Sequence, residues 1–379
     1  MDRNITHQMI TGTCAAALAI TLAILCALTL NAQGNPPKYE VDPSWPRPLP
    51  DKWVTGAISG VCTDAQDHVF IVNQGNLTEN ELDAGHQAPP VIEFDSEGVV
   101  VNSWGNREIL PEGLHGCFVD YQNSVWLSGS HDGIIQKYAH DGGKLLLQIG
   151  TKDVIDSSDG TVAGTALNSS HKGFYRPSGI AVDPSDGTIY VADGEEAGSN
   201  HRVAVFDRNG RFLHQWVLEH TKAEEDAGEG AALTDVPHCV AIGNDGLIYV
   251  CDRFNDRVQV FNKMGKFQKN ILIPYEKRSQ YNPGTGHVPR ARGTAEWVGF
   301  SADRPQRFMF VVNEDDEEVE ILDHASGKIV SSFGRAGHQV GQLTDAHTLA
   351  VDSKGNVYVG EAGGDEAGNR VQKFTNAGN

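Results

Sequence analysis

Residues 240–261 read Val240-Ala-Ile-Gly-Asn-Asp-Gly-Leu-Ile-Tyr-Val-Cys-Asp-Arg-Phe-Asn-Asp-Arg-Val-Gln-Val-Phe261. The same unit recurs as Ile180-Ala-Val-Asp-Pro-Ser-Asp-Gly-Thr-Ile-Tyr-Val-Ala-Asp193 and as Leu349-Ala-Val-Asp-Ser-Lys-Gly-Asn-Val-Tyr-Val-Gly360. Short alternating β-branched runs that are broken by Asp-Gly or Lys-Gly turns predict antiparallel strands joined by hairpins. No segment has a sustained apolar period of 3.6, so the chain should be all-β with few helices.

The segment that leads into each strand pair recurs six times along the chain. Its aligned positions are Ser59, His115, Ser178, His238, Glu296 and His347. Self-similarity at a period of roughly 50–60 residues predicts a propeller or a solenoid. Six units favour a closed ring, because closure removes exposed strand edges. We therefore predict a six-bladed β-propeller over residues 37–379, in which the N-terminal segment from about Pro37 to Val41 supplies the outer strand of the last blade.

Composition limits the partners of this chain. Among 379 residues, 50 are acidic and 30 are basic, which gives a net charge of −20. Because binding to phosphates needs a basic surface, nucleic acid is not expected as a partner. The run from Glu314 to Glu318 is expected to be a solvated surface loop, with a cation site as the alternative. We expect a monomer.

The first 32 residues are expected to be a targeting segment. A polar start with Arg3 precedes a mostly apolar run from Ala15 to Leu30, and Asn31-Ala32 follows. This order of regions predicts a secretory signal that is cleaved after Ala32, and hence export to the periplasm or the extracellular space. The alternative is an uncleaved anchor, which would make the membrane a partner.

The mature chain keeps four cysteines. The hairpin centred on Asn244-Asp245-Gly246 places Cys239 opposite Cys251, and an exported protein permits a disulfide there. A pair of buried thiols is the alternative, because directly opposed strand residues strain a disulfide. Cys62 and Cys117 are expected to be packing residues of inner strands, and no C-x-x-C spacing supports a thiolate zinc site.

Three histidines occupy one repeat position, and they do so on alternate repeats. In a ring, equivalent positions lie at equal radius, so His115, His238 and His347 should lie roughly 120° apart around the axis. Three neutral imidazoles with a fourth position open form the ligand set of a catalytic zinc. A single histidine at a strand start is usually structural, but three on alternate blades predict a shared metal. Zinc is expected first, with copper, iron or nickel as other divalent candidates.

Several motifs carry a family resemblance. They are Leu114-His-Gly116, Arg176-Pro-Ser-Gly-Ile-Ala-Val-Asp183, Val236-Pro-His-Cys-Val-Ala-Ile242 and Ala346-His-Thr-Leu-Ala-Val351. With them, the chain from about Tyr39 onward resembles NHL-repeat six-bladed propellers, and among them the peptidyl-α-hydroxyglycine α-amidating lyase domain and its bacterial relatives. The resemblance implies that His115, His238 and His347 are zinc ligands. It implies that Arg253 holds a substrate carboxylate, and a strand-tying structural role is the alternative.

The chain also departs from that lyase at three positions. Where the lyase places a tyrosine that is taken as a base, this chain reads Asp193-Gly194-Glu195-Glu196. Glu195 would be a replacement base if it faces the axis, and an exposed loop carboxylate otherwise. Gln74 stands in place of a second arginine, and Thr348 in place of an aspartate that helps to bind calcium.

These departures leave two hypotheses of different classes. The first is a zinc-dependent, lyase-like enzyme acting on a small-molecule or peptide-derived anionic substrate. In that case the missing tyrosine predicts weak turnover of peptidyl-α-hydroxyglycine. The second is a non-catalytic NHL-propeller binding module in which the metal braces the axis. Because fold does not decide function, the site itself must separate the two.

Overall fold

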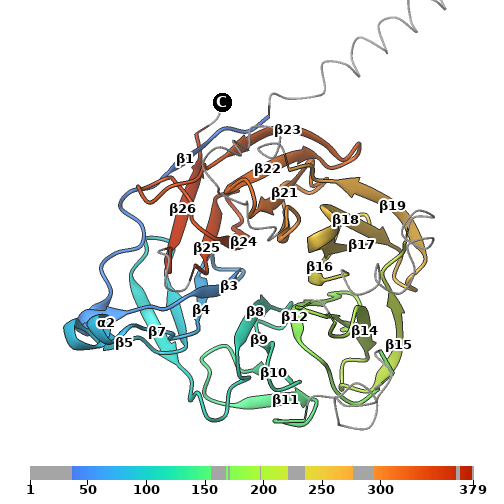
Figure 1. The fold of residues 1–379 in the computed structure, drawn as a ribbon, viewed down its shortest axis with the longest axis horizontal. Coiled ribbons are helices and arrows are strands. Elements are labelled where there is room, and N and C mark those ends of the chain that lie inside the picture. The colour runs from blue at the N-terminus through green and yellow to red at the C-terminus, as the bar shows by residue number, and fades with distance from the viewer. Residues whose placement is uncertain are drawn as a thin grey trace, which may run out of the picture. The chain divides into compact units, whose positions relative to one another are not determined.

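Six four-stranded antiparallel sheets surround one central axis, as Figure 1 shows. This computed structural model describes residues 36–154, 168–169, 171–196, 198–220, 235–275, 293–363 and 368–377. The predicted all-β, six-bladed propeller is confirmed. The leader predicted over residues 1–32 lies outside the described residues. Among the residues that are described, no helix is both long enough and apolar enough to cross a membrane.

Every blade has four strands, and its innermost strand contacts the innermost strands of both neighbouring blades. Ordered from the axis outward, the strands are β3 (Ile58–Thr63), β4 (Val69–Asn73), β6 (Val91–Phe94) and β7 (Val100–Trp104) in blade one; β8 (Leu114–Val119), β9 (Val125–Gly129), β10 (Ile135–Tyr138) and β11 (Leu145–Ile149) in blade two; β12 (Pro177–Val182), β13 (Ile189–Asp193), β14 (Arg202–Phe206) and β15 (Phe212–Val217) in blade three; β16 (Pro237–Ile242), β17 (Ile248–Asp252), β18 (Arg257–Phe261) and β19 (Phe267–Leu272) in blade four; β20 (Trp297–Phe300), β21 (Phe308–Asn313), β22 (Glu318–Asp323) and β23 (Lys328–Phe333) in blade five; and β24 (Ala346–Val351), β25 (Val357–Glu361), β26 (Val371–Asn376) and β1 (Tyr39–Val41) in blade six.

Within the described residues, helical elements are few and short, as predicted. They are η1 (Pro50–Lys52), α2 (Glu79–Ala84) and η2 (Arg253–Asn255). Helix α2 begins at a capping box, in which Thr78 and Glu81 each bind the other's backbone N–H. Strand β2 (Trp53–Val54), which precedes this helix, pairs in parallel with β5 (His86–Gln87), which follows it.

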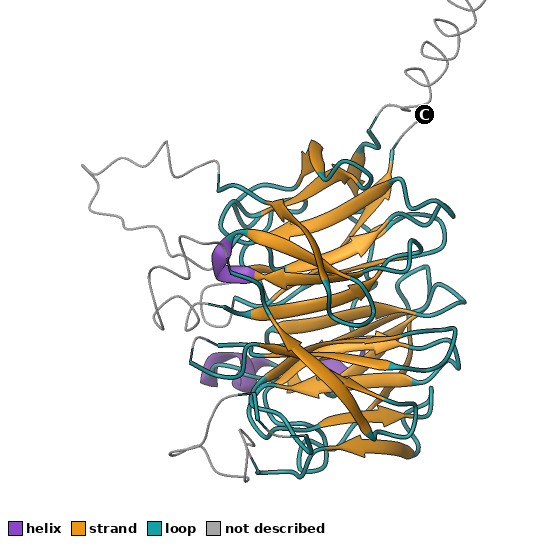
Figure 2. Ribbon diagram, turned by 90° about the vertical axis from the view of Figure 1, so that its right-hand side faces the viewer, coloured by secondary structure: helices purple, strands orange, loops and turns teal. Residues whose placement is uncertain are grey.

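The burial pattern explains why these sequences form blades. The second strand of several blades is buried along its whole length, as in β4, β13 and β17. These strands are rich in β-branched and aromatic residues, which suit a pleated surface covered on both faces. The outer strand β23 instead alternates between exposed and less exposed residues. The strands run between the two faces of the ring, with loops at both faces (Figure 2).

The N-terminal strand closes the ring, as predicted. Strand β1 pairs with β26 in the register Tyr39↔Asn376 to Val41↔Phe374, and the two strands lie side by side in Figure 1. The ring of Tyr39 contacts Phe333 at a centroid distance of 4.8 Å, and its hydroxyl donates to the Gly355 carbonyl at 2.9 Å. Strand β1 thus covers the edge of β26 and also packs onto blade five.

Two disulfides are present, and one of them corrects the sequence analysis. Cys62 and Cys117 were expected to be separate packing residues, but they form a disulfide that joins β3 to β8. The reason is that the inner strands of adjacent blades pack side by side, which brings the two Cα atoms within 5.5 Å across a separation of 55 residues. Cys239 and Cys251 also form a disulfide. A break in register between Pro237 and Val240 removes the direct opposition that disfavoured this bond.

Removal of β1 should destabilise the ring. A protein that begins at Pro43 should melt at least about 5 °C below one that begins at Lys38, because it loses roughly 3 kcal/mol of packing and exposes the edge of β26. Thermal unfolding and light scattering of the two proteins would measure stability and aggregation. Equal melting temperature and equal solubility would show that β1 is not needed for closure.

Candidate metal centre

An irregularity at the start of the inner strands directs side chains toward the axis. In blades two, four and six the register with the second strand shifts at the start of β8, β16 and β24. His115, His238 and His347 lie inside these three irregular stretches. A bulge of this kind re-aims a side chain at the rim of a closed sheet structure. The three imidazoles therefore leave the sheet direction and meet at the centre.

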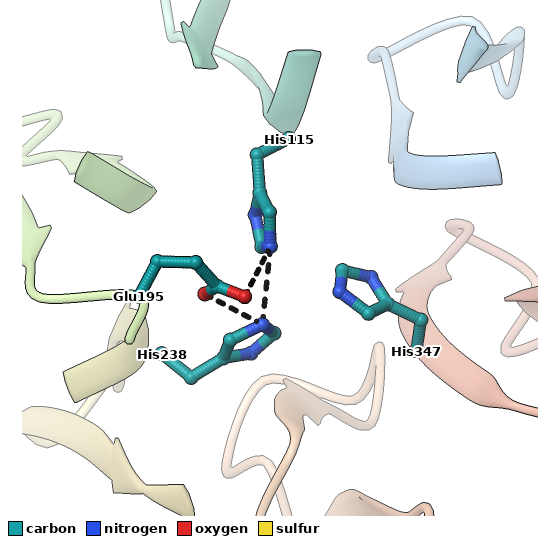
Figure 3. Close-up of side chains that lie close together, drawn as sticks. All are labelled: His115, Glu195, His238 and His347. Carbon is teal, nitrogen blue, oxygen red and sulfur yellow. Dashed lines mark hydrogen bonds and ion pairs between the residues drawn. The ribbon is translucent and has the colours of Figure 1, made fainter. Parts of the chain in front are cut away.

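The three predicted histidines converge on one point (Figure 3). Their ring centroids are 4.7, 4.8 and 4.8 Å apart, so they form a nearly equilateral triangle. The Nε2 atoms of His115 and His238 are 3.2 Å apart. All three rings come from alternate blades and are buried. A single ion can thus reach all of them.

The hydrogen bonds of two histidines leave their Nε2 lone pairs facing inward. His238 Nδ1 lies 2.7 Å from the Glu296 carbonyl oxygen, and His347 Nδ1 lies 3.1 Å from that of Ser59. Since a carbonyl can only accept, each Nδ1 carries the proton and donates. Burial also lowers the pKa of His238 to about 4 and that of His347 well below its ordinary value. Both imidazoles are neutral at pH 7, as metal ligands would have to be.

Glu195 completes the group from blade three. It faces the axis, although as a loop residue it could equally have been exposed, and only 16% of its side chain is accessible. Its carboxylate oxygens lie 3.2 Å from His115 Nε2 and 3.0 Å from His238 Nε2. Burial opposes the ionisation of Glu195, but its attraction to His115 and the hydrogen bond between them help to hold its pKa well below the ordinary value.

The backbone after β13 places this carboxylate. The main-chain N–H groups of Gly194 and Glu195 both donate to the Arg176 carbonyl at 2.9 Å. Gly194 has a φ of 156°, and a Cβ there would lie 2.0 Å from the Asn200 carbonyl oxygen. Glycine is therefore required for the turn that brings Glu195 back toward the axis.

Arg253 is enclosed by three carboxylates. Its guanidinium lies 2.7 Å from Glu296, 2.9 Å from Glu314 and 3.3 Å from Glu195. These neighbours raise its pKa despite its burial. Arg253 thus orients the carboxylates around the histidines, and most of its donors are already engaged.

The acidic run from Glu314 to Glu318 is not the solvated loop that the sequence predicted. Glu314 and Asp316 are each 4% exposed, and Glu314 turns inward to bind Arg253. The reason is that Glu314 directly follows β21, as Arg253 directly follows β17, so the two residues start equivalent loops on neighbouring blades. The buried guanidinium compensates the charge of this carboxylate.

Glu296 is a further acidic residue at the axis, for which the sequence alone predicted no role although it aligns with the three histidines. Glu296 occupies the histidine position of blade five and is fully buried. Its Oε1 lies 3.2 Å from His238 Nε2 and 3.5 Å from His347 Nε2. A ligand-type side chain at the same repeat position as the histidines was the signal that could have revealed it.

The donors fit a divalent cation. With Nδ1 protonated, His238 Nε2 presents a lone pair to His115, Glu195 and Glu296 at 3.0–3.2 Å. Lone pairs at these distances repel unless a cation lies among them or a proton, such as one on His115 Nε2, is shared between them. Donors around a tetrahedral zinc, with bonds of roughly 2.0–2.1 Å, are spaced by about 3.3 Å. The carboxylates of Glu195, Glu296 and Glu314 with the guanidinium of Arg253 leave two negative charges, which match a divalent ion.

The other departures from the lyase pattern lie near the histidines. Gln74 donates from its side chain to the Leu114 carbonyl at 3.2 Å, next to His115. The guanidinium of Arg107 donates to the main-chain oxygens of Asn73 and Gln74 at 3.1 and 2.7 Å. An arginine thus reaches this corner of blade one from the segment after β7. Thr348 is fully buried beside His347.

Part of this chain matches a known repeat family, and most of it is similar to known proteins. The NHL repeat family model matches residues 174–206 and 234–261, which lie in blades three and four. The chain is an NHL-repeat propeller. NHL repeat-containing protein 3 of Homo sapiens is 25% identical over 355 residues, which cover 89% of this chain and 84% of that protein.

The NHL-repeat propeller is also homologous to amidating enzymes. Peptidyl-glycine alpha-amidating monooxygenase A of Xenopus laevis is 27% identical over 356 residues, covering 89% of this chain but 33% of that protein. The NHL-repeat propeller thus spans about a third of that enzyme. Among solved structures, a streptogramin B lyase matches with a TM-score of 0.51 and 12% identity, covering 89% of this chain and 97% of that one. That likeness shows the fold alone.

Loss of one axial histidine should release the metal. His238→Ala should lower the bound zinc by about one equivalent per chain, because two imidazoles hold the ion less tightly than three. Metal analysis after dialysis against buffered zinc would measure this. His214→Gln, on outer strand β15, is the control and should keep the full content. Full zinc content in His238→Ala would contradict the assignment.

Loss of Arg253 should destabilise the fold. Arg253→Ala should cost about 3–5 kcal/mol in denaturant unfolding, because three carboxylates lose their shared guanidinium. Arg211, which is 80% exposed and pairs with Asp207, offers a control. Arg211→Ala should cost less than about 1 kcal/mol. Similar losses in the two variants would show that the carboxylates do not depend on Arg253.

Proposed function

We propose that this NHL-repeat propeller is a zinc-dependent, lyase-like enzyme that acts on a small-molecule or peptide-derived anionic substrate. The observation that carries the proposal is the inward-facing donor set of His115, His238 and His347, with the Glu195 carboxylate against two of them. When bound, zinc would supply Lewis acidity to a substrate oxygen. Homology to the amidating enzymes supports a lyase over other reactions of this metal.

Glu195 is proposed as the base. In a substrate of the peptidyl-α-hydroxyglycine type, the hydroxyl and the amide nitrogen are bonded to the same carbon. The hydroxyl proton would pass to a Glu195 oxygen while the bond from that carbon to nitrogen breaks and the carbonyl forms. The amide nitrogen then takes a proton, so the products are an amide and a keto or aldehyde acid. Glu195 is suited to this role by position, because its carboxylate lies at the axis beside the Nε2 atoms of two imidazoles.

Arg253 is proposed to position Glu195 rather than to hold the substrate. Its contacts to Glu195, Glu296 and Glu314 leave little of the guanidinium for another carboxylate. A role in positioning the base also gives a reason for an arginine to lie buried among three acidic side chains. The substrate anion would then have to bind another cationic or N–H group.

Export is part of the same proposal. The two disulfides, Cys62–Cys117 and Cys239–Cys251, support an oxidising compartment. The apolar segment from Ala15 to Leu30 supports a secretory route. The protein would therefore meet its substrate in the periplasm or outside the cell.

A second function has one specific observation in its favour. Glu195 is close enough to the histidines to be a fourth ligand, which would close the coordination shell. Structural zinc sites have four protein ligands, whereas catalytic sites keep one position for water or substrate. In that case the propeller is a binding module, and the metal braces three blades.

Glyoxylate release from a peptidyl-α-hydroxyglycine separates these functions. The zinc-loaded protein should release glyoxylate slowly, and Glu195→Gln should lower the rate by about a hundredfold or more, because a general base contributes 10²–10⁴. The neighbouring Glu196 is 59% exposed and pairs with Arg176, so Glu196→Gln is a matched control that should keep the rate. Release that is insensitive to zinc removal and to Glu195→Gln would refute the lyase, and no release would favour the binding module.

A further inference from the structure

A second group of ligand-type side chains lies at the other end of the inner strand of blade one. Ser59, at the axial repeat position, starts β3, whereas Asp64 directly follows its end. Asp64, His68 and Glu93 have ligand atoms that all lie within 4.8 Å of one another. His68 Nδ1 is 2.7 Å from Glu93 Oε1 and 3.8 Å from Asp64 Oδ2. This group lies outside the axial site.

The two carboxylates of this group are buried, and imidazoles are the ionisable groups that face them. Asp64 Oδ1 also accepts the main-chain N–H groups of Gln66 and His68 at 2.8 Å, whereas its Oδ2 faces the imidazoles. The side chains of Asp64 and Glu93 are 0% and 4% exposed. Within the described residues, no lysine or arginine lies within ion-pair distance of either one. Their charged partners would have to be His68 and His140, whose side chains are 32% and 29% exposed. Buried carboxylates are usually paired with a cation or coordinate a metal.

The other blades show what this repeat position normally contains. The aspartate equivalent to Asp64 is Asp120 in blade two, where Lys137 Nζ lies 2.8 Å from its Oδ2. In blade three it is Asp183, which pairs with Lys263 from blade four. In blade one, by contrast, Glu93 stands at the position of Lys137. The lysine is thus replaced by a second carboxylate, so the two side chains together carry two negative charges, whereas Asp120 and Lys137 together carry none.

His140 connects this group to blade two. It occupies the repeat position of Lys263, two residues beyond the third strand. Its Nε2 lies 2.9 Å from Asp64 Oδ2, and its ring packs edge-on against Phe70 at 5.2 Å. A hydrogen bond from a neighbouring imidazole orients a carboxylate ligand in the manner of an outer-shell partner.

We propose that Asp64, His68 and Glu93 form a second divalent-metal site, with His140 as the residue that positions Asp64. One imidazole and two carboxylates suit zinc and neighbouring first-row ions. The partial exposure of His68 and His140 opens a path for the ion and leaves room for water to complete its shell. The ion would reinforce the interface of blades one and two, which the Cys62–Cys117 disulfide also crosses.

Zinc titration of the full chain by calorimetry tests this site. The unaltered protein, stripped with a chelator, should bind two equivalents, and His68→Gln should bind one. His140→Gln should still bind two, with the second roughly ten- to a hundredfold more weakly. Zinc should also raise the melting temperature of the unaltered protein more than that of His68→Gln. The melting curve of each zinc-free variant confirms that it is folded.

His324 provides the matched control, because it stands at the repeat position of His140 in blade five. There it contacts Tyr249 and lies 3.8 Å from Asp245, with no second carboxylate at the position of Glu93. His324→Gln should therefore keep both equivalents. A single equivalent that is lost in His238→Ala and unchanged in His68→Gln would overturn this proposal and leave the axial site intact. A single equivalent that is lost in His68→Gln instead would support it and refute the axial one.

Discussion

The convergence of like donors on the propeller axis is the constraint on which the site depends. Imidazole nitrogens and carboxylate oxygens approach within 3.0–3.2 Å, so a cation or a shared proton is needed to balance their lone pairs. The fold supplies the restraint that holds these donors together. The inner strands of adjacent blades contact one another all around the ring, and the histidines lie in irregular register at the starts of three of them.

The carboxylates beside the histidines are themselves backed by a positive charge, which offsets part of their negative charge. Arg253 lies behind Glu195 and Glu296, so two carboxylates that contact the imidazoles are held by one guanidinium. The backbone carbonyls of Ser59 and Glu296 set the tautomers of His347 and His238. For these two histidines, the next blade around the ring therefore supplies the outer partner, so the site depends on contacts between blades.

The repeat pattern was enough to predict the fold and the three histidines, because equivalent positions in a closed ring share one radius. Contacts between blades were harder to predict. The Cys62–Cys117 disulfide depends on how closely β3 and β8 approach, and the inward turn of Glu314 depends on Arg253 in the loop of the neighbouring blade. The orientation of Glu195 follows from the turn at Gly194, which sequence alone left undecided.

Anomalous diffraction at the zinc absorption edge, from crystals of the zinc-loaded protein, would test whether one ion lies among the three axial imidazoles. We expect an anomalous peak on the propeller axis at roughly 2.0–2.1 Å from the Nε2 atoms of His115, His238 and His347. The distance from that peak to Glu195 would also show whether the fourth position is closed by the protein. The absence of anomalous density among the three imidazoles, with the histidines in the same arrangement, would contradict this expectation.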